Sequence, residues 1–132
     1  MRILIADDYE GIRGGIRTLL MARPDWEVCG EAVNGQDAVR LAGELQPDVI
    51  IMDITMPVMS GLEATEQLTK HGSNTKVLIF TTHESQTLQA TVRKTGARGY
   101  VLKSQAARDL LKAVGCLQGG GTFFDSGNRE TS

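Results

Sequence analysis

The sequence predicts an α/β fold, in which a doubly wound parallel sheet of five strands carries five helices on its two faces. Short aliphatic runs alternate five times with stretches in which apolar residues recur every three or four positions. This alternation is typical of strand–helix units built around one parallel sheet. Because right-handed crossovers restrict how such units connect, we expect the strand order 2-1-3-4-5. The first strand then lies beside the third.

Four of the five expected strands are short runs rich in apolar side chains, and the second, at 26–31, is more mixed. The runs at 3–6 and 49–52 contain no polar residue at all. The fourth run ends in the hydroxyl pair Thr81 and Thr82, and the fifth is followed by Lys103. Continuous apolar runs of this kind are typical of strands that are covered on both faces. The expected strands are 2–6, 26–31, 48–53, 76–81 and 99–102.

Helical spacing fills the intervals between the strands. In the first interval Ile12, Ile16 and Leu19 fall on one face of a helix. Asn34 and Ser104 precede the second and fifth helical patterns, where their side-chain oxygens can accept hydrogen bonds from free backbone N–H groups. The expected helices are 9–22, 35–46, 61–71, 85–95 and 105–118.

The overall composition is that of one globular domain. A chain of 132 residues is long enough to bury an ordinary core. The net charge of −2 gives no electrostatic basis for nucleic-acid binding by this segment. No apolar stretch approaches the ~20 residues that span a bilayer, and the N-terminus lacks a signal-peptide pattern. We therefore expect no membrane association and a cytoplasmic location.

The end of the chain differs in character from the rest. Three glycines at 119–121 end the last helical pattern, and a short, largely polar segment follows. We divide the chain into a domain at 1–118 and a linker or disordered tail at 119–132. This tail is expected to lead to a further domain that is absent from this chain. A frayed natural terminus is the alternative.

Three carboxylates follow neighbouring strands of the expected sheet. Asp7 and Asp8 come directly after the first strand, and Asp53 follows the third. Ligands of open parallel sheets bind outside the carboxyl ends of the strands. Two carboxylates about 4 Å apart repel by roughly 4 kcal/mol at an effective dielectric of 20, and a hard cation such as Mg²⁺ relieves this repulsion. The alternative for Asp7 or Asp8 alone is a helix cap.

An amine and a hydroxyl are expected at the same edge. Lys103 supplies a point charge that can hold a phosphoryl or carboxylate oxygen. Thr81 can donate its hydroxyl to an anionic oxygen, with Thr82 as a competitor for this role. The alternatives are a solvated lysine and an ordinary β-branched strand residue. Together these groups indicate a site for a divalent cation and a phosphoryl group.

In combination, these motifs resemble the response-regulator receiver domain of bacterial two-component systems. The resemblance covers residues 1 to about 118, and it rests on four features in the expected order. They are the acidic pair Asp7-Asp8, the string from Asp53 to Gly61, Thr81, and the string from Gly99 to Lys103. It implies the flavodoxin-like receiver fold and a phosphorylation-activated signalling switch, not an enzyme in the ordinary sense.

The resemblance also implies the roles of the site residues. Asp53 would be the phosphoacceptor, and Asp8 would bind Mg²⁺ directly. Asp7 would bind the ion directly or through water, Asp53 would be a further carboxylate ligand, and the backbone carbonyl of Thr55 would be the remaining protein ligand. Lys103 would pair with Asp53 and then with the phosphoryl group.

Three further residues are expected to transmit or tune the signal. The resemblance implies that Thr81 hydrogen-bonds the phosphoryl oxygen and that Tyr100 is the aromatic switch whose rotamer follows Thr81. His83 lies two positions after Thr81, where its bulk can tune the access of water; an exposed loop histidine is the alternative. Ser104 stands where many receivers carry a proline, which leaves the Lys103–Ser104 peptide either trans or cis.

Lysine followed by serine is typical of the NarL/LuxR-like class. This resemblance implies a sensor histidine kinase as donor, a helix-turn-helix output domain outside this chain through which DNA would be bound, and a homodimer on phosphorylation. A stand-alone receiver that acts by protein docking is the alternative. A cobalamin module is disfavoured because the Asp-x-His-x-x-Gly motif is missing, and a flavin module because the first strand is not followed by a hydroxyl-rich loop. An aspartate-based phosphatase is disfavoured because the second acid of an Asp-x-Asp motif is missing after Asp53.

Overall fold

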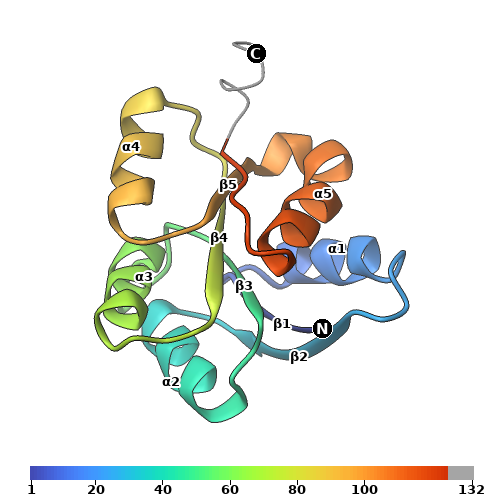
Figure 1. Cartoon of the computed structure of the whole chain (residues 1–132), viewed down its shortest axis with the longest axis horizontal. Helices are drawn as coiled ribbons and strands as arrows, with labels where there is room; N and C mark the ends of the chain where they lie inside the picture. The colour runs from blue at the N-terminus through green and yellow to red at the C-terminus, as the bar shows by residue number, and fades with distance from the viewer. Residues whose placement is uncertain (125–132) are drawn as a thin grey trace.

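The computed structural model describes residues 1–124, which form one sheet in the order β2-β1-β3-β4-β5 with all neighbours parallel (Figure 1). The predicted order and all ten predicted elements are confirmed. The strands are β1 (Arg2–Ala6), β2 (Glu27–Ala32), β3 (Val49–Met52), β4 (Lys76–Thr81) and β5 (Gly99–Leu102). The helices are α1 (Glu10–Leu20), α2 (Gly35–Leu45), α3 (Gly61–Lys70), α4 (Gln86–Lys94) and α5 (Ala106–Gln118), with a short 3₁₀ helix η1 (Lys103–Gln105) before α5.

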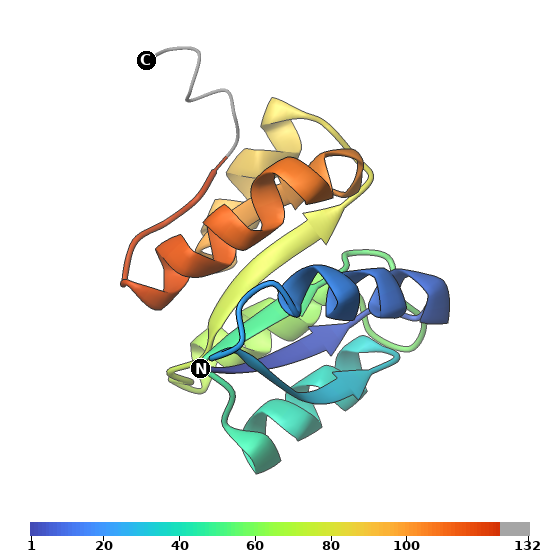
Figure 2. The same cartoon turned by 90° about the vertical axis from the view of Figure 1, so that its right-hand side faces the viewer.

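Two helical layers cover the sheet. Helices α1 and α5 lie on one face, and α2, α3 and α4 lie on the other; Figure 2 brings α1 and α5 in front of the sheet. Side chains of β1 alternate between the layers, because Ile3 and Ile5 pack with α1 and α5 whereas Leu4 and Ala6 pack on the opposite side. All four are buried. The unbroken apolar runs therefore reflect strands that are covered on both faces.

Local hydrogen bonds decide where two of the helices begin. Asn34 caps α2 as predicted, and its side-chain oxygen accepts from the Asp37 N–H at 2.7 Å. The prediction for Ser104 is wrong, because Ser104 lies inside η1 and α5 begins only after Gln105. The chain leaves β5 through one tight 3₁₀ turn, and this turn takes up the residues that would otherwise have opened the helix.

The described part of the tail, 119–124, returns along the edge of the sheet. The Tyr100 N–H donates to the Phe123 carbonyl at 2.8 Å, and the Phe123 N–H donates to the Arg98 carbonyl at 3.0 Å. Gly99 and Phe123 thereby form a parallel bridge beside β5. The compact unit extends past the expected boundary at 118 as far as Phe124. The remainder of the expected linker, 125–132, lies outside the described residues.

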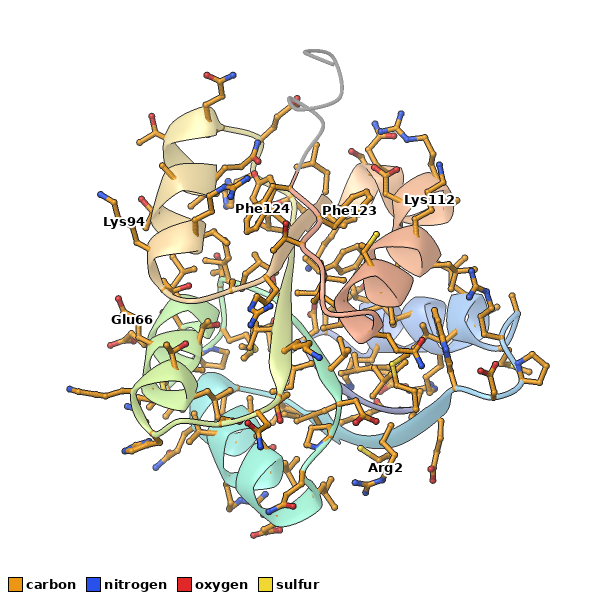
Figure 3. The ribbon with its side chains drawn as sticks, viewed as in Figure 1. Arg2, Glu66, Lys94, Lys112, Phe123 and Phe124 are labelled. Carbon is orange, nitrogen blue, oxygen red and sulfur yellow. The ribbon has the colours of Figure 1, made fainter. Side chains whose placement is uncertain are left out.

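The two aromatic rings of this segment pack into the hydrophobic clusters on opposite faces of the sheet (Figure 3). Phe124 is buried in the cluster that contains Tyr100, and Phe123 packs against the cluster beneath α5. The Arg93 guanidinium on α4 lies 4.0 Å from the centroid of the Phe124 ring. Such a cation–π contact is worth ~0.5–1 kcal/mol at an exposed site. The segment after α5 is therefore packed against the α4–β5 side of the domain.

Candidate functional site

The carboxyl ends of β1 and β3 meet at one edge of the sheet. The ladder pairs Ala6 with Met52 and continues by one residue, because the Asp53 N–H donates to the Ala6 carbonyl at 2.9 Å. The Asp7 N–H donates to the carbonyl of Ala32, the last residue of β2, at 3.0 Å. Backbone hydrogen bonds thus fix Asp7 and Asp53 next to each other.

The structure brings the three predicted acids together. One carboxylate oxygen from each of Asp7, Asp8 and Asp53 lies within 4.8 Å of the others. Asp7 and Asp53 are 1% and 8% exposed, whereas Asp8 is exposed at the mouth of the cluster. Hard oxygen donors with one open side fit Mg²⁺, which keeps several waters. Thr55 lies in the loop directly after Asp53, and the role of its carbonyl as a ligand stays a prediction.

Lys103 brings the predicted amine from the end of β5. Its Nζ lies 2.8 Å from Oδ2 of Asp7 and 3.3 Å from Oδ1 of Asp53. The contact with Asp53 was expected, and the shorter contact with Asp7 was not. The ammonium group is largely buried, so it offsets negative charge where water does not screen it. Within residues 1–124 no peptide bond is cis, and the Lys103–Ser104 peptide is trans.

Asp53 holds its proton more tightly than an ordinary aspartate. Burial raises the pKa of its carboxyl group, and the neighbouring Asp7 carboxylate raises this pKa further. Lys103 and a hydrogen bond of 2.9 Å from the Ile54 N–H lower the pKa and offset only part of this rise. Because the folded protein binds this proton more tightly than the unfolded chain, ionising Asp53 costs folding free energy.

We expect Asp53→Asn to raise the melting temperature of the metal-free protein at neutral pH. As the pH falls from above the folded-state pKa of Asp53 toward the ordinary value of 3.8, the wild type regains this free energy and the difference should shrink. Thermal melts in EDTA across this range measure the effect, with Asp48→Asn, just before β3, as the control. A wild type that melts above Asp53→Asn at neutral pH would contradict the expectation.

A close turn after β3 holds the backbone of Asp53. A Cβ atom on Gly61 would lie 1.9 Å from the carbonyl oxygen of Asp53, so this position admits only glycine. The Gly61 N–H donates to the Ile54 carbonyl at 2.8 Å. Ser60 caps α3 and exchanges reciprocal hydrogen bonds with Glu63. The start of α3 is therefore fixed directly against the residue that carries the buried carboxylate.

The backbone of His83 links Thr81 to Tyr100. Thr81 is buried at the end of β4, whereas Thr82 is exposed. The His83 N–H donates to Oγ1 of Thr81 at 3.2 Å, and the His83 carbonyl accepts a hydrogen bond from the Tyr100 hydroxyl. Tyr100 is 2% exposed, so its ring lies inward in this structure. The side chain of His83 is exposed.

The sequence model of the response regulator receiver domain matches residues 3–115. The chain belongs to the response regulator receiver family. It is 38% identical over 124 residues to the transcriptional regulatory protein DegU of Brevibacillus brevis, and the aligned segment covers 94% of this chain and 52% of DegU. It is 38% identical over 112 residues to the nitrate/nitrite response regulator protein NarL of Escherichia coli, with coverage of 85% and 52%. The chain spans about half the length of these relatives.

Solved receiver structures have the same fold. A LuxR-family response regulator from Aurantimonas superposes with a TM-score of 0.88 at 34% identity, over 92% of this chain and 87% of that chain. The isolated receiver domain of RcsB from Salmonella enterica, in the presence of the phosphomimetic BeF₃⁻, gives a TM-score of 0.87 at 27% identity, over 96% and 94%. The predicted relation to NarL/LuxR-type regulators is confirmed by these neighbours and by the curated relatives.

Receiver domains of this family are phosphorylation switches of two-component signalling and bind Mg²⁺ at an acidic pocket. They are signalling domains and not ordinary enzymes. In this receiver the acidic cluster has the donor atoms that the ion requires. None of the helices within residues 1–124 has both the length and the apolar character needed to cross a membrane.

Sequence reasoning missed one group that contacts this site. Arg13 on α1 donates through Nη1 to the backbone carbonyl of Asp7 at 2.8 Å and through Nε to Glu31 of β2 at 2.8 Å. The sequence offered one signal, because Arg13 lies near the start of the helix that follows the Asp7-Asp8 pair. Its partners were not readable, because β2 and α1 meet only in the folded domain.

Proposed function

We propose that Asp53 is the phosphoacceptor and that a phosphohistidine on a sensor histidine kinase is its donor. A carboxylate oxygen of Asp53 attacks the phosphorus atom. The P–N bond breaks as the new P–O bond forms, and the imidazole nitrogen keeps the electron pair of the broken bond. The observation that supports this assignment most strongly is the burial of Asp53 at the end of β3, beside the Lys103 ammonium and two further acids.

Each neighbour of Asp53 has a proposed role. Asp8 would hold Mg²⁺ directly, Asp7 directly or through water, Asp53 through its carboxylate and Thr55 through its carbonyl. When bound, the ion would neutralise charge on the oxygens of the transferring phosphoryl group. Lys103 already contacts both buried acids and would turn its ammonium toward a phosphoryl oxygen. Labelling by a small phosphodonor, with Asp53→Asn as the comparison, tests the assignment.

The same residues would assist the later loss of the phosphoryl group as well as its arrival. We propose that His83 tunes this second step. Its exposed side chain lies two residues after Thr81, in the loop after β4, at the same edge of the sheet as the acidic cluster. Its bulk and hydrogen-bonding groups would regulate how water reaches the aspartyl phosphate, while its backbone serves the contacts with Thr81 and Tyr100.

Phosphorylation would act on the face formed by α4, β5 and α5. The hydroxyl of Thr81 accepts a hydrogen bond from the His83 N–H, and the His83 carbonyl accepts one from Tyr100. When the Thr81 hydroxyl turns to a phosphoryl oxygen, the first of these bonds is lost. The loop that carries the second bond is then free to move. Packed interiors have discrete arrangements, so a small displacement can shift the position of the Tyr100 ring.

We expect Thr81→Ala to accept a phosphoryl group and fail to transmit the change. In wild type, beryllofluoride with Mg²⁺ should shift the amide resonances of Tyr100 and residues 82–95, whereas Val101 and Leu102 stay fixed. In Thr81→Ala the shifts should remain near Asp53. Thr81→Ser keeps the hydroxyl and is the matched control. The relay is refuted if Thr81→Ala gains the same distant shifts as wild type.

The output of the switch is proposed from the relatives and from the tail. DegU and NarL are named as transcriptional and response regulators, and each is about twice as long as the matched segment. We propose that residues 119–132 lead to a helix-turn-helix output domain, so that DNA is bound only through that domain. Phe124 packs in the same cluster as Tyr100, which gives the switch a direct route to the following segment.

Two related expectations, on location and on dimerisation, remain proposals. The domain would act in the cytoplasm, where a kinase and a genomic target are both accessible. Phosphorylation would favour a homodimer through the face formed by α4, β5 and α5. The alternative to a transcription regulator is a stand-alone receiver that acts by docking to a partner protein. The coding sequence downstream of Ser132 distinguishes the two, because only a transcription regulator requires a DNA-binding domain there.

A further inference from the structure

We propose that Arg13 is a positioning residue for the metal-binding carboxylates, acting through the peptide that joins Asp7 to Asp8. This inference rests on the proposed function, because it assumes that these acids hold Mg²⁺. It concerns a residue of α1 that would touch neither the ion nor the phosphoryl group. Its effect would come through the backbone from which the two carboxylates project.

Each of the three nitrogen atoms of the Arg13 guanidinium donates a hydrogen bond to a different residue. Nη1 donates to the Asp7 carbonyl at 2.8 Å, Nε donates to Oε1 of Glu31 at 2.8 Å, and Nη2 donates to Oε1 of Glu10 at 2.6 Å. Its side chain is only 12% exposed. A largely buried, planar group with three partners is held in one orientation, and it holds the Asp7 carbonyl in turn.

The Asp7 carbonyl belongs to the peptide plane between the two adjacent acids. Its direction sets the backbone torsions on both sides, and hence the direction in which the Asp8 side chain leaves the chain. Asp7 has other restraints, because its carboxylate accepts from Lys103 and from the Tyr9 N–H. Within residues 1–124 the exposed Asp8 carboxylate has no hydrogen bond or ion pair of its own. Its position therefore depends on the peptide that Arg13 holds.

Glu31 anchors this arrangement to the sheet. It lies in β2 next to Ala32, whose carbonyl accepts the Asp7 N–H at 3.0 Å. Burial of Glu31 raises the pKa of its carboxyl group, and hydrogen bonds from Arg13 and Arg17 more than offset this, so the pKa lies below its usual value. The carboxylate is consequently charged at neutral pH. A continuous chain of hydrogen bonds therefore links β2 to the Asp7 carbonyl through Glu31 and Arg13.

Arg17 provides a matched control one turn along α1. It contacts the same two acids, through Nη1 to Oε2 of Glu31 at 2.6 Å and through Nη2 to Oε2 of Glu10 at 3.4 Å. None of its contacts reaches the Asp7 carbonyl. Replacing either arginine with glutamine removes one positive charge from the same network. Only the Arg13 replacement removes the hydrogen bond to the acidic loop.

The direction of the change in Mg²⁺ affinity distinguishes a positioning role of Arg13 from a purely electrostatic one. Removing a positive charge near a cation site should strengthen Mg²⁺ binding, because repulsion is lost. Loss of positioning should weaken it, and outer residues that orient metal ligands typically contribute about 10-fold or more to affinity. We therefore expect Arg13→Gln to bind Mg²⁺ about 10-fold more weakly than wild type. Arg17→Gln should bind it as wild type does, or slightly more tightly.

The experiment is a calorimetric titration of the purified protein with Mg²⁺ alone, supported by amide spectra of each variant. Arg13→Lys keeps the charge without the three-way geometry, and it should stay weakened. Glu31→Gln keeps Arg13 but loosens its anchor, and it should fall between wild type and Arg13→Gln. If Arg13→Gln fails to fold, the Mg²⁺ affinity of Glu31→Gln tests the inference in its place.

Unchanged or tighter Mg²⁺ binding in folded Arg13→Gln would overturn the inference, as would equal weakening in Arg17→Gln. If Arg13→Gln does not fold, wild-type affinity in Glu31→Gln overturns it. Failure of the proposed function has a different signature, because Mg²⁺ would then bind equally well to wild type and Asp8→Ala. If Asp8→Ala loses the ion while Arg13→Gln keeps it, only the role of Arg13 is refuted.

Discussion

Asp53→Asn is expected to abolish labelling of this protein by acetyl phosphate in the presence of Mg²⁺. The amide lacks the anionic oxygen that attacks phosphorus, and the other acids are differently placed. Asp7 is held by Lys103, and Asp8 is exposed at the mouth of the cluster. Intact-mass spectrometry should find one phosphoryl group on wild type and none on Asp53→Asn.

A matched control lies at the opposite end of the same strand. Asp48 precedes β3, and its carboxylate accepts from the Arg2 N–H at 2.8 Å, far from the carboxyl edge of the sheet. Asp48→Asn makes the same chemical change and should be labelled as wild type is. Labelling of Asp53→Asn at the wild-type rate would remove Asp53 from its proposed role.

Asp8→Ala is expected to weaken Mg²⁺ binding more than any other single replacement in the cluster. Asp7 already shares its charge with Lys103, and Asp53 is buried beside the same ammonium, so Asp8 offers the most accessible carboxylate. Loss of one direct anionic ligand from a site with few protein ligands should reduce affinity at least about tenfold. Calorimetric titration with Mg²⁺ measures this loss.

Glu84→Ala controls for the loss of charge alone. Glu84 is exposed in the loop after β4, at the same edge of the sheet. Its removal should change the Mg²⁺ affinity by no more than about twofold, because exposed charges are strongly screened. Without metal, Asp8→Ala should melt slightly higher than wild type, since one repulsive charge is gone. A lower melting temperature would instead favour a helix-capping role for Asp8.

The positions of the site residues were predictable because the strands are covered on both faces. Such strands are continuous apolar runs, so the first polar residue after each run marks the carboxyl edge of the sheet. Asp7, Asp53 and Lys103 were located in this way, and the strand order predicted their convergence. The contact between Lys103 and Asp7 was not predictable, because it depends on how the chain turns through η1 after β5.

Two other features lie beyond the reach of sequence periodicity. The segment at 119–124 begins with three glycines and reads as a linker, yet it pairs with Gly99 through Phe123. Nothing in its local pattern specifies a partner strand or a register. The contacts of Arg13 were hidden for a similar reason. A helical arginine is usually a solvated surface group, and only the folded arrangement of α1 and β2 lets it contact Glu31 and the Asp7 carbonyl together.

The central claim is that Asp53 is a Mg²⁺-dependent phosphoacceptor, and chemical trapping of the modified residue tests it most directly. An aspartyl phosphate is an acyl phosphate, which borohydride reduces to homoserine at the residue that carried the phosphoryl group. After incubation of wild type with acetyl phosphate, peptide mapping should find homoserine at position 53, with Mg²⁺ and not with EDTA. Homoserine at position 7 or 8, or equal yield at position 53 without the metal, would contradict the claim.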